Sequence, residues 1–247
     1  MNLFHPTTFT IWFSAATLIL ACRWRPALIL GSAAGLFHII SRGVSLGRLP
    51  LLGPHDTLLF FGVSLAIMGL FVSYSPAIRT VRCFNPVAGV LAGVVILAAL
   101  TFQPLNMPLP QILDTLWFEL HVVVAFFGYA LFVIGGLLSA LYLFTGIRSY
   151  LDVYFKTALV GWTFFSASMI SGGVWGYYAW GTYWLWTPKE LWTSVLWLFY
   201  AMALHVRLKG ARWDTLSAWL GIIGVFVMLF TYLGVSMLMK SSHSFAN

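Results

Sequence analysis

Charged residues are scarce in this sequence. Asp, Glu, Lys and Arg together make up 8% of its 247 residues, and only six are acidic, whereas an ordinary soluble domain is about one quarter charged. Because 61% of the residues are hydrophobic, the chain has too little polar surface to cover itself in water. This composition excludes a soluble globular protein and indicates a protein that lies in a lipid bilayer.

Cysteine is also scarce, with Cys22 and Cys83 far apart in the chain. No CxxC or CxxCH motif is present, which excludes a disulfide framework and a haem attached covalently to this chain. The net charge of +7 comes without a Lys/Arg cluster or a basic stripe, so we expect no nucleic-acid partner. The basic residues instead carry information about membrane topology.

Long apolar runs, by contrast, fill most of the chain. They predict an all-α fold, a polytopic membrane bundle of about eight transmembrane helices. We expect one membrane domain over residues 1–247, with a four-helix half, 1–102, and a second half, 103–247. The first run lacks a basic segment before it and a cleavage site after it, so we expect a retained helix. The predicted helices cover residues 7–22, 27–41, 57–75, 86–102, 117–146, 156–174, 190–208 and 215–238.

Basic residues sort into alternate loops between these helices. Cytoplasmic loops are enriched in Lys and Arg, so the side that carries nine of the 13 basic residues is predicted to be cytoplasmic. Both termini, the start of the fifth helix and the loop after the sixth then meet at the outer face. The cytoplasmic set is Arg23, Arg25, Arg79, Arg82, Arg148, Lys156, Arg207, Lys209 and Arg212, and the outer set is Arg42, Arg48, Lys189 and Lys240.

Six of the 12 tryptophans lie within 23 residues, in and just after the predicted outer loop 175–189. An interfacial belt of Trp and Tyr is one interpretation. A belt, however, spreads over many helix ends, whereas these residues share one loop in which Gly176 and Gly181 allow tight turns. Such a surface suits a large, flat, apolar ligand. The candidate platform residues are Trp175, Trp180, Trp184, Trp186 and Trp192.

Two histidines are predicted to lie beside this loop. His121 begins the fifth helix and His243 follows the eighth, so the predicted topology places both at the outer face. Either one alone could be a hydrogen-bonded residue at a helix end. Together, two neutral imidazoles that flank an aromatic platform could ligate a haem iron from both sides.

The other histidines lie elsewhere in the chain. His205 would lie about 22 Å into the seventh helix at 1.5 Å per residue, and an ionisable residue inside a membrane span is a functional candidate. His38 in the second helix is a weaker candidate of the same kind. His5 and His55 are interpreted as loop residues.

Residues 180–192 read Trp-Gly-Thr-Tyr-Trp-Leu-Trp-Thr-Pro-Lys-Glu-Leu-Trp. This segment resembles the tryptophan-rich WWD signature of haem-handling proteins, specifically the CcsA (ResC) type of System II cytochrome c biogenesis. The continuation Pro188-Lys189-Glu190 favours this branch over the sister family CcmC. The segments around His121, around His205 and over residues 232–246 resemble the histidine-bearing segments of that family, in the same order.

The resemblance implies a subunit that holds haem b at the outer face for attachment to an apocytochrome c with a CxxCH motif. In that family an outer histidine pair ligates the iron and the aromatic loop holds the porphyrin, and the ligands here would be His121 and His243. His205 would ligate a second, intramembrane haem together with a partner subunit, CcsB. No nucleophile or base is implied, and the expected location is a bacterial inner membrane or a thylakoid-type membrane.

The sequence departs from the signature at Thr187, where the family has Asp. Threonine cannot carry charge, so Thr187, together with Glu190, could tune the site differently. Three hypotheses stay open. The chain is a subunit of a cytochrome c haem lyase or synthase; it is a divergent paralogue that acts as a non-catalytic haem-binding or electron-transfer subunit, or regulates haem supply; or it is a transporter whose aromatic loop is only a belt.

Overall fold

The computed structural model describes residues 6–20, 25–79, 81 and 84–238, which form helices joined by loops. Among these residues, six helices are long and apolar enough to cross a membrane, and Thr8–Leu20 and Phe84–Ala99 are shorter apolar helices. The prediction of a polytopic helical membrane protein is therefore confirmed, whereas eight spans and the sides of the termini stay predictions. The chain divides into two compact units, Met1–Gln111 and Ile112–Asn247.

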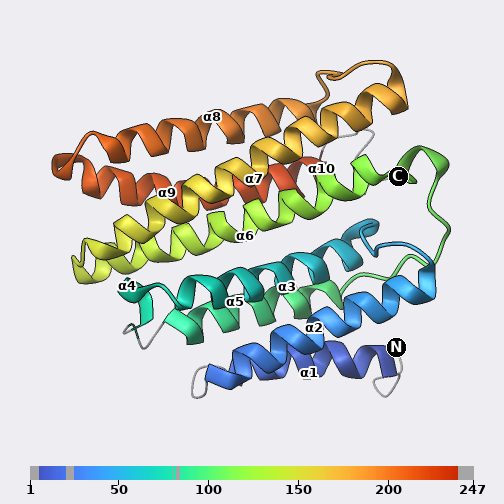
Figure 1. Cartoon of the computed structure of the whole chain (residues 1–247), viewed down its shortest axis with the longest axis horizontal. Coiled ribbons are helices and arrows are strands. Elements are labelled where there is room, and N and C mark those ends of the chain that lie inside the picture. The colour runs from blue at the N-terminus through green and yellow to red at the C-terminus, as the bar shows by residue number, and fades with distance from the viewer. Residues whose placement is uncertain (1–5, 21–24, 80, 82–83, 239–247) are drawn as a thin grey trace. The chain divides into compact units, whose positions relative to one another are not determined.

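The first unit is built on pairs of packed helices. Helix α3 packs against α5, and α1 packs against both α2 and α5 (Figure 1). A Cβ on Gly62 of α3 would lie 3.0 Å from the carbonyl oxygen of Ala92 in α5, so the two backbones approach closely, as is common between membrane helices. The helices are α1 (Pro6–Leu20), α2 (Arg25–Leu46), α3 (Gly53–Ser73), α4 (Pro76–Arg79) and α5 (Phe84–Ala99).

A buried ionic cluster joins α2 to α3. Arg42 donates from Nε over 2.7 Å and from Nη2 over 3.1 Å to the two carboxylate oxygens of Asp56, and Nδ1 of His55 donates to Oδ1 over 2.9 Å. The interpretation of His55 as a loop residue is wrong, because α3 already begins at Gly53. Pro54 favours this early start, since proline suits the first turn of a helix.

The second unit is a bundle around one long hairpin. Helices α6 and α7 lie side by side and are joined through Gly146, whose φ of 70° is left-handed (Figure 1). A Cβ on Gly128 would lie 3.0 Å from the carbonyl oxygen of Gly161, which brings the two helices into close contact. Its main helices are α6 (Leu116–Thr145), α7 (Ser149–Trp180), α8 (Pro188–Leu208), α9 (Asp214–Leu229) and α10 (Val235–Leu238).

Ion pairs tie three helices of this unit together at their predicted cytoplasmic ends. Arg207 of α8 contacts Asp152 of α7 over 2.6 Å and Asp214 of α9 over 3.1 Å, and Arg148 contacts the other oxygen of Asp214 over 2.9 Å. The shared Arg207 fixes the start of α7, the end of α8 and the start of α9 relative to one another. This leaves the opposite ends of α7 and α8 to form the candidate site.

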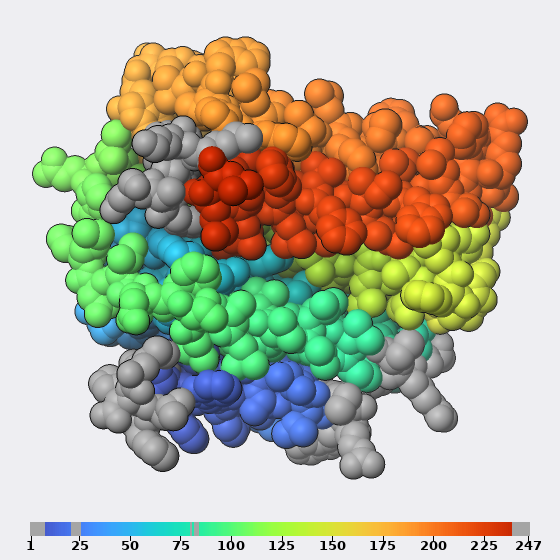
Figure 2. Space-filling model, turned by 180° about the vertical axis from the view of Figure 1, so that it is seen from behind, coloured from blue at the N-terminus to red at the C-terminus, as the bar shows by residue number. Residues whose placement is uncertain are grey.

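The outward sides of α8 and α9 are apolar. Figure 2 shows α9 and α10 along one face of the second unit, in orange-red to red. Large apolar side chains are exposed along these helices, among them Leu198, Trp219, Ile223 and Phe226. An apolar surface of this extent is typical of contact with lipid or with another membrane subunit.

Candidate functional site

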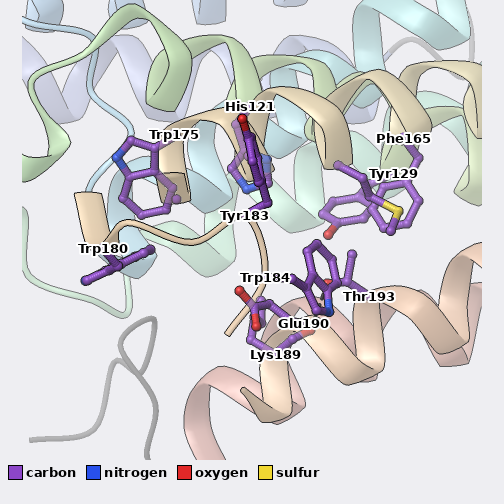
Figure 3. Close-up of a pocket in the computed structure, with 13 residues that line it drawn as sticks. His121, Tyr129, Phe165, Trp175, Trp180, Tyr183, Trp184, Lys189, Glu190 and Thr193 are labelled. Carbon is purple, nitrogen blue, oxygen red and sulfur yellow. Dashed lines mark hydrogen bonds between the residues drawn. The ribbon is translucent and has the colours of Figure 1, made fainter. Parts of the chain in front are cut away.

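A pocket opens in the second unit between α6, the end of α7, the loop after it and the start of α8. The cavity itself has a volume of about 80 Å³, and the empty space reaches about 590 Å³ only when the open solvent at its mouth is included. Figure 3 shows Trp175 and Trp180 at one end of the view, Tyr129 and Phe165 at the other, and His121 between them.

The aromatic segment is only partly a loop. Helix α7 continues to Trp180 and ends at Gly181, whose φ of 74° is left-handed, and α8 begins at Pro188. The predicted loop 175–189 and the predicted helix end at residue 174 are therefore wrong. Gly176 is not a turn residue: it lies inside α7, where a Cβ would be 3.3 Å from the carbonyl oxygen of Thr182. Gly176 instead allows the segment after α7 to pack closely against the helix, and α7 continues through it.

His121 lies in the first turns of α6, with one ring nitrogen fixed. Nδ1 donates to the carbonyl oxygen of Ser168 on α7 over 2.8 Å and lies 3.0 Å from the Ser168 hydroxyl. Because a carbonyl oxygen only accepts, Nδ1 carries the proton and Nε2 carries the lone pair. Metal-binding histidines show this arrangement, in which the second nitrogen donates to a backbone carbonyl.

Glycine makes room for this histidine. A Cβ on Gly172 of α7 would lie 2.5 Å from Nδ1 of His121, closer than a real Cβ approaches. Any larger residue at position 172 would therefore displace the imidazole. The position of the His121 ring, and with it the direction of Nε2, therefore depends on the small residue Gly172 as well as on the hydrogen bond to Ser168.

Trp175 forms a rigid wall of the pocket. Its ring is buried, Nε1 donates to the carbonyl oxygen of Ile112 over 2.8 Å, and Trp180 contacts it edge-on with the centroids 4.8 Å apart. The plane of Trp175 lies within 19° of the plane of His121, with centroids 6.5 Å apart. The histidine and the tryptophan thus present nearly parallel planes.

Not every predicted platform residue lines the pocket. Trp175, Trp180 and Trp184 line it. Trp186 is 70% exposed, and Trp192 packs edge-on against Phe230 with the centroids 4.5 Å apart. The platform formed by the described residues is therefore narrower than the tryptophan cluster in the sequence, and Trp186 is presented outward.

A capping box holds the loop at the start of α8. The Thr187 hydroxyl accepts from the backbone N–H of Glu190 over 3.4 Å, and Oε2 of Glu190 accepts from the N–H groups of Thr187 and Leu185, each over 2.9 Å. These two N–H groups flank Trp186, which has a φ of 59°, a conformation that is strained for a residue with a side chain. Glu190 therefore stabilises the turn that presents Trp186.

Thr187→Asp is expected to leave the stability of the protein within about 0.5 kcal/mol of wild type, since Asp and Thr both cap helix N-termini. Thr187→Ala is expected to cost about 1 kcal/mol, because the cap is lost. Thermal unfolding of the detergent-purified variants measures both. Equal losses for Asp and Ala would contradict capping as the role of this position.

Two other histidine candidates, His205 and His38, do not line the pocket. His205 is exposed on α8, and its Nδ1 donates to the carbonyl oxygen of Ala201 over 2.7 Å, which directs the lone pair to Nε2. His38 is buried in the first unit, where Nδ1 contacts the Thr10 hydroxyl over 2.7 Å and Nε2 has no partner among the described residues. His243 lies outside the described residues.

Sequence reasoning did not single out Tyr129 or Phe165 as pocket residues, yet both line the pocket. The sequence could have indicated Tyr129, because it lies eight positions after His121 and so on the same face of α6. Phe165 lies on the face of α7 that also carries Gly172 and Gly176. Lys189 also lines the pocket, but its hydrogen-bond partners could not be predicted, since they lie 42 and more positions further along the chain.

Comparison with known proteins gives a consistent set of relatives. A family described as cytochrome C assembly protein matches residues 52–243. The cytochrome c biogenesis protein CcsA of Synechococcus sp. (strain RCC307) is 28% identical over 84% of this chain and 79% of its own. The CcsA proteins of Trieres chinensis and of Prochlorococcus marinus (strain MIT 9515) are each 29% identical, over 85% and 84% of this chain and 82% and 78% of their own.

Proposed function

The chain belongs to the cytochrome c assembly protein family and has a role of the CcsA type in cytochrome c biogenesis, and from this premise we propose that it holds haem b for attachment to an apocytochrome c. The observation that carries the proposal is His121. Its Nδ1 is fixed by Ser168 and its Nε2 has no hydrogen-bond partner among the described residues, beside a tryptophan wall. This donor set fits a haem iron ligand.

The residues around His121 would bind the haem, orient it and shield it from water. Trp175, fixed through its hydrogen bond to Ile112, excludes water from one side, and Tyr129 and Phe165 extend the apolar lining. Haem supplies the vinyl groups that the thiols of a CxxCH motif attack, while the protein supplies position and a low dielectric. We propose His243, which lies outside the described residues, as the second axial ligand.

His205 is proposed as the ligand of a second haem. Its ring is exposed on the apolar surface of α8, and the hydrogen bond from Nδ1 to Ala201 leaves Nε2 for the metal. An iron there needs a further ligand, and we propose that a CcsB-like membrane subunit provides it. The partners are then that subunit, an apocytochrome c and the bilayer of a bacterial inner membrane or a thylakoid-type membrane.

A second candidate function is a haem-binding subunit without synthase activity. The observation that favours it is Thr187, which keeps the cap but not the negative charge of the family signature. Such a paralogue would hold haem for electron transfer or would regulate haem supply.

Deletion of the gene distinguishes the two candidates. For a synthase subunit we expect a reporter cytochrome with a CxxCH motif to lose about nine tenths or more of its covalent haem, and the wild-type gene to restore it. The control is a b-type cytochrome, whose haem content should not change. Full maturation in the deletion strain, with haem in the purified protein, would identify the non-synthase subunit, and a colourless protein expressed with its natural partners would contradict both.

A further inference from the structure

The last membrane helix is interrupted by a π-helical turn. Residues Phe230–Gly234 join α9 to α10, and the N–H of Val235 bonds to the carbonyl oxygen of Phe230. A π turn contains one residue more than an α turn and is frequently found at functional sites. Because it departs from the α-helical pattern, something outside the helix has to stabilise it.

Lys189 supplies that stabilisation. Its Nζ donates to the carbonyl oxygens of Thr231 over 2.7 Å and Tyr232 over 2.9 Å, and to the hydroxyl of Ser236 over 2.8 Å. An ammonium group has three donors, and all three are used within this one stretch. The nitrogen also lies 5.9 Å from the centroid of the Tyr232 ring, which adds a cation–π attraction.

The position of Lys189 in α8 is unfavourable by itself. It lies in the first turn, where the helix dipole favours negative rather than positive charge. Local helix formation therefore does not account for a lysine at this position. The contacts with the π turn, more than 40 positions away, do account for it.

The π turn is also packed against the pocket. Tyr232 contacts Phe126 edge-on with the centroids 5.2 Å apart and lies 5.9 Å from Tyr129, which lines the pocket. On the other side, Phe230 contacts Trp192 of α8. The turn thus connects the start of α8, the pocket side of α6 and α10.

We infer that Lys189 is a positioning residue that fixes the rotational register of α10 by holding the π turn. If the turn returned to α-helical geometry, the residues after it would rotate by about 100°. Val235 is fully buried now, whereas Leu238 is 75% exposed. The rotation would move Val235 toward the surface and would change the direction in which the side chains of α10 face.

Thiol labelling tests this inference without any need for bound haem. In a background with Cys22→Ser and Cys83→Ser, Val235→Cys reports a buried position and Leu238→Cys an exposed one. Lys189→Met, which keeps an apolar stem but cannot donate, is expected to raise the labelling rate of Val235→Cys by an uncharged maleimide by about tenfold, since burial then no longer protects it. Lys209→Met, at the other end of α8, is the matched control and should not change either rate.

An unchanged labelling rate of Val235→Cys in the Lys189→Met protein would overturn the inference. A general rise at both reporter positions, with loss of a monodisperse peak in size-exclusion chromatography, would show global unfolding and would also count against it. Lys189→Arg gives a further check: it keeps the charge but not the three convergent donors, and it should restore only part of the protection.

A second readout links the inference to haem, and it rests on the proposed function. If His243 is the second ligand, as proposed, a changed direction of α10 should remove it: Lys189→Met should keep haem on His121 but change its absorption spectrum from low-spin to high-spin, and added imidazole should restore the low-spin form. A low-spin spectrum equal to wild type would count against the inference. A colourless wild type would overturn the proposed function and leave the labelling result to decide the role of Lys189.

Discussion

His121→Ala is expected to remove haem from the purified protein at the pocket site and to abolish maturation of a CxxCH reporter. Loss of a group that merely orients a metal ligand lowers affinity about 10–100-fold, so loss of the ligand itself should cost at least as much. The measurement is the reduced-minus-oxidised absorption spectrum of the protein, normalised to protein concentration. An unchanged spectrum and full reporter maturation would contradict the assignment of His121.

Two further variants separate loss of the iron ligand from a general loss of structure. Gly172→Ala keeps the imidazole but places a Cβ 2.5 Å from Nδ1, so it should lower haem content by displacing the ring. His205→Ala tests the second proposed haem, because its side chain is exposed and lies outside the pocket; it should remove only the part of the haem signal that His121→Ala retains. It should leave the pocket haem in place.

The class of fold could be predicted from the sequence because length and composition decide it. Runs such as 117–146 and 190–208 are long enough to span a bilayer, and the helices Leu116–Thr145 and Pro188–Leu208 occupy nearly the same residues. The end of α7 could not be predicted, since Gly176 and Gly181 are chemically identical. Only the packing of the second unit makes one a helix-interior contact and the other a left-handed cap.

Part of the site could be predicted from the order of the helices. An aromatic cluster and a histidine at the same predicted face required only topology, and the structure places His121, Trp175, Trp180 and Trp184 around one pocket. The hydrogen bond that orients His121 could not be predicted, because Ser168 lies 47 positions away on another helix. That contact depends on the relative register of α6 and α7, which local sequence patterns do not encode.

The polar cluster of the first unit shows the same limit. Local pattern gives no reason to pair Arg42 with Asp56. Charged groups are costly within membrane spans, so their presence alone indicates a partner but does not name it. The helical packing of α2 on α3 decides that the partner of Arg42 is a carboxylate in the first turn of α3, where the helix dipole also favours negative charge.

Asp56→Ala is expected to destabilise the protein by about 3–5 kcal/mol, because removing one member of a buried ion pair leaves the other charge uncompensated. The Asp56 side chain is 0% exposed. Without it, Arg42 keeps, among the residues that the structure describes, only Asn106 and the carbonyl oxygen of Leu105 as partners, at 3.2 Å and 3.4 Å. Thermal unfolding in detergent should show a fall of roughly 10 °C or more in Tm.

Asp152→Ala is the matched control for this experiment. It also removes the carboxylate of an Asp–Arg pair, but the Asp152 side chain is 61% exposed, and an exposed pair is worth at most about 1 kcal/mol. Equal losses from the two substitutions would contradict a buried, uncompensated charge as the cause. A double substitution, Arg42→Met with Asp56→Leu, should recover part of the loss, because it removes the orphaned cation as well. Recovery would show that the pairing of the two charges, rather than either group alone, stabilises the contact between α2 and α3.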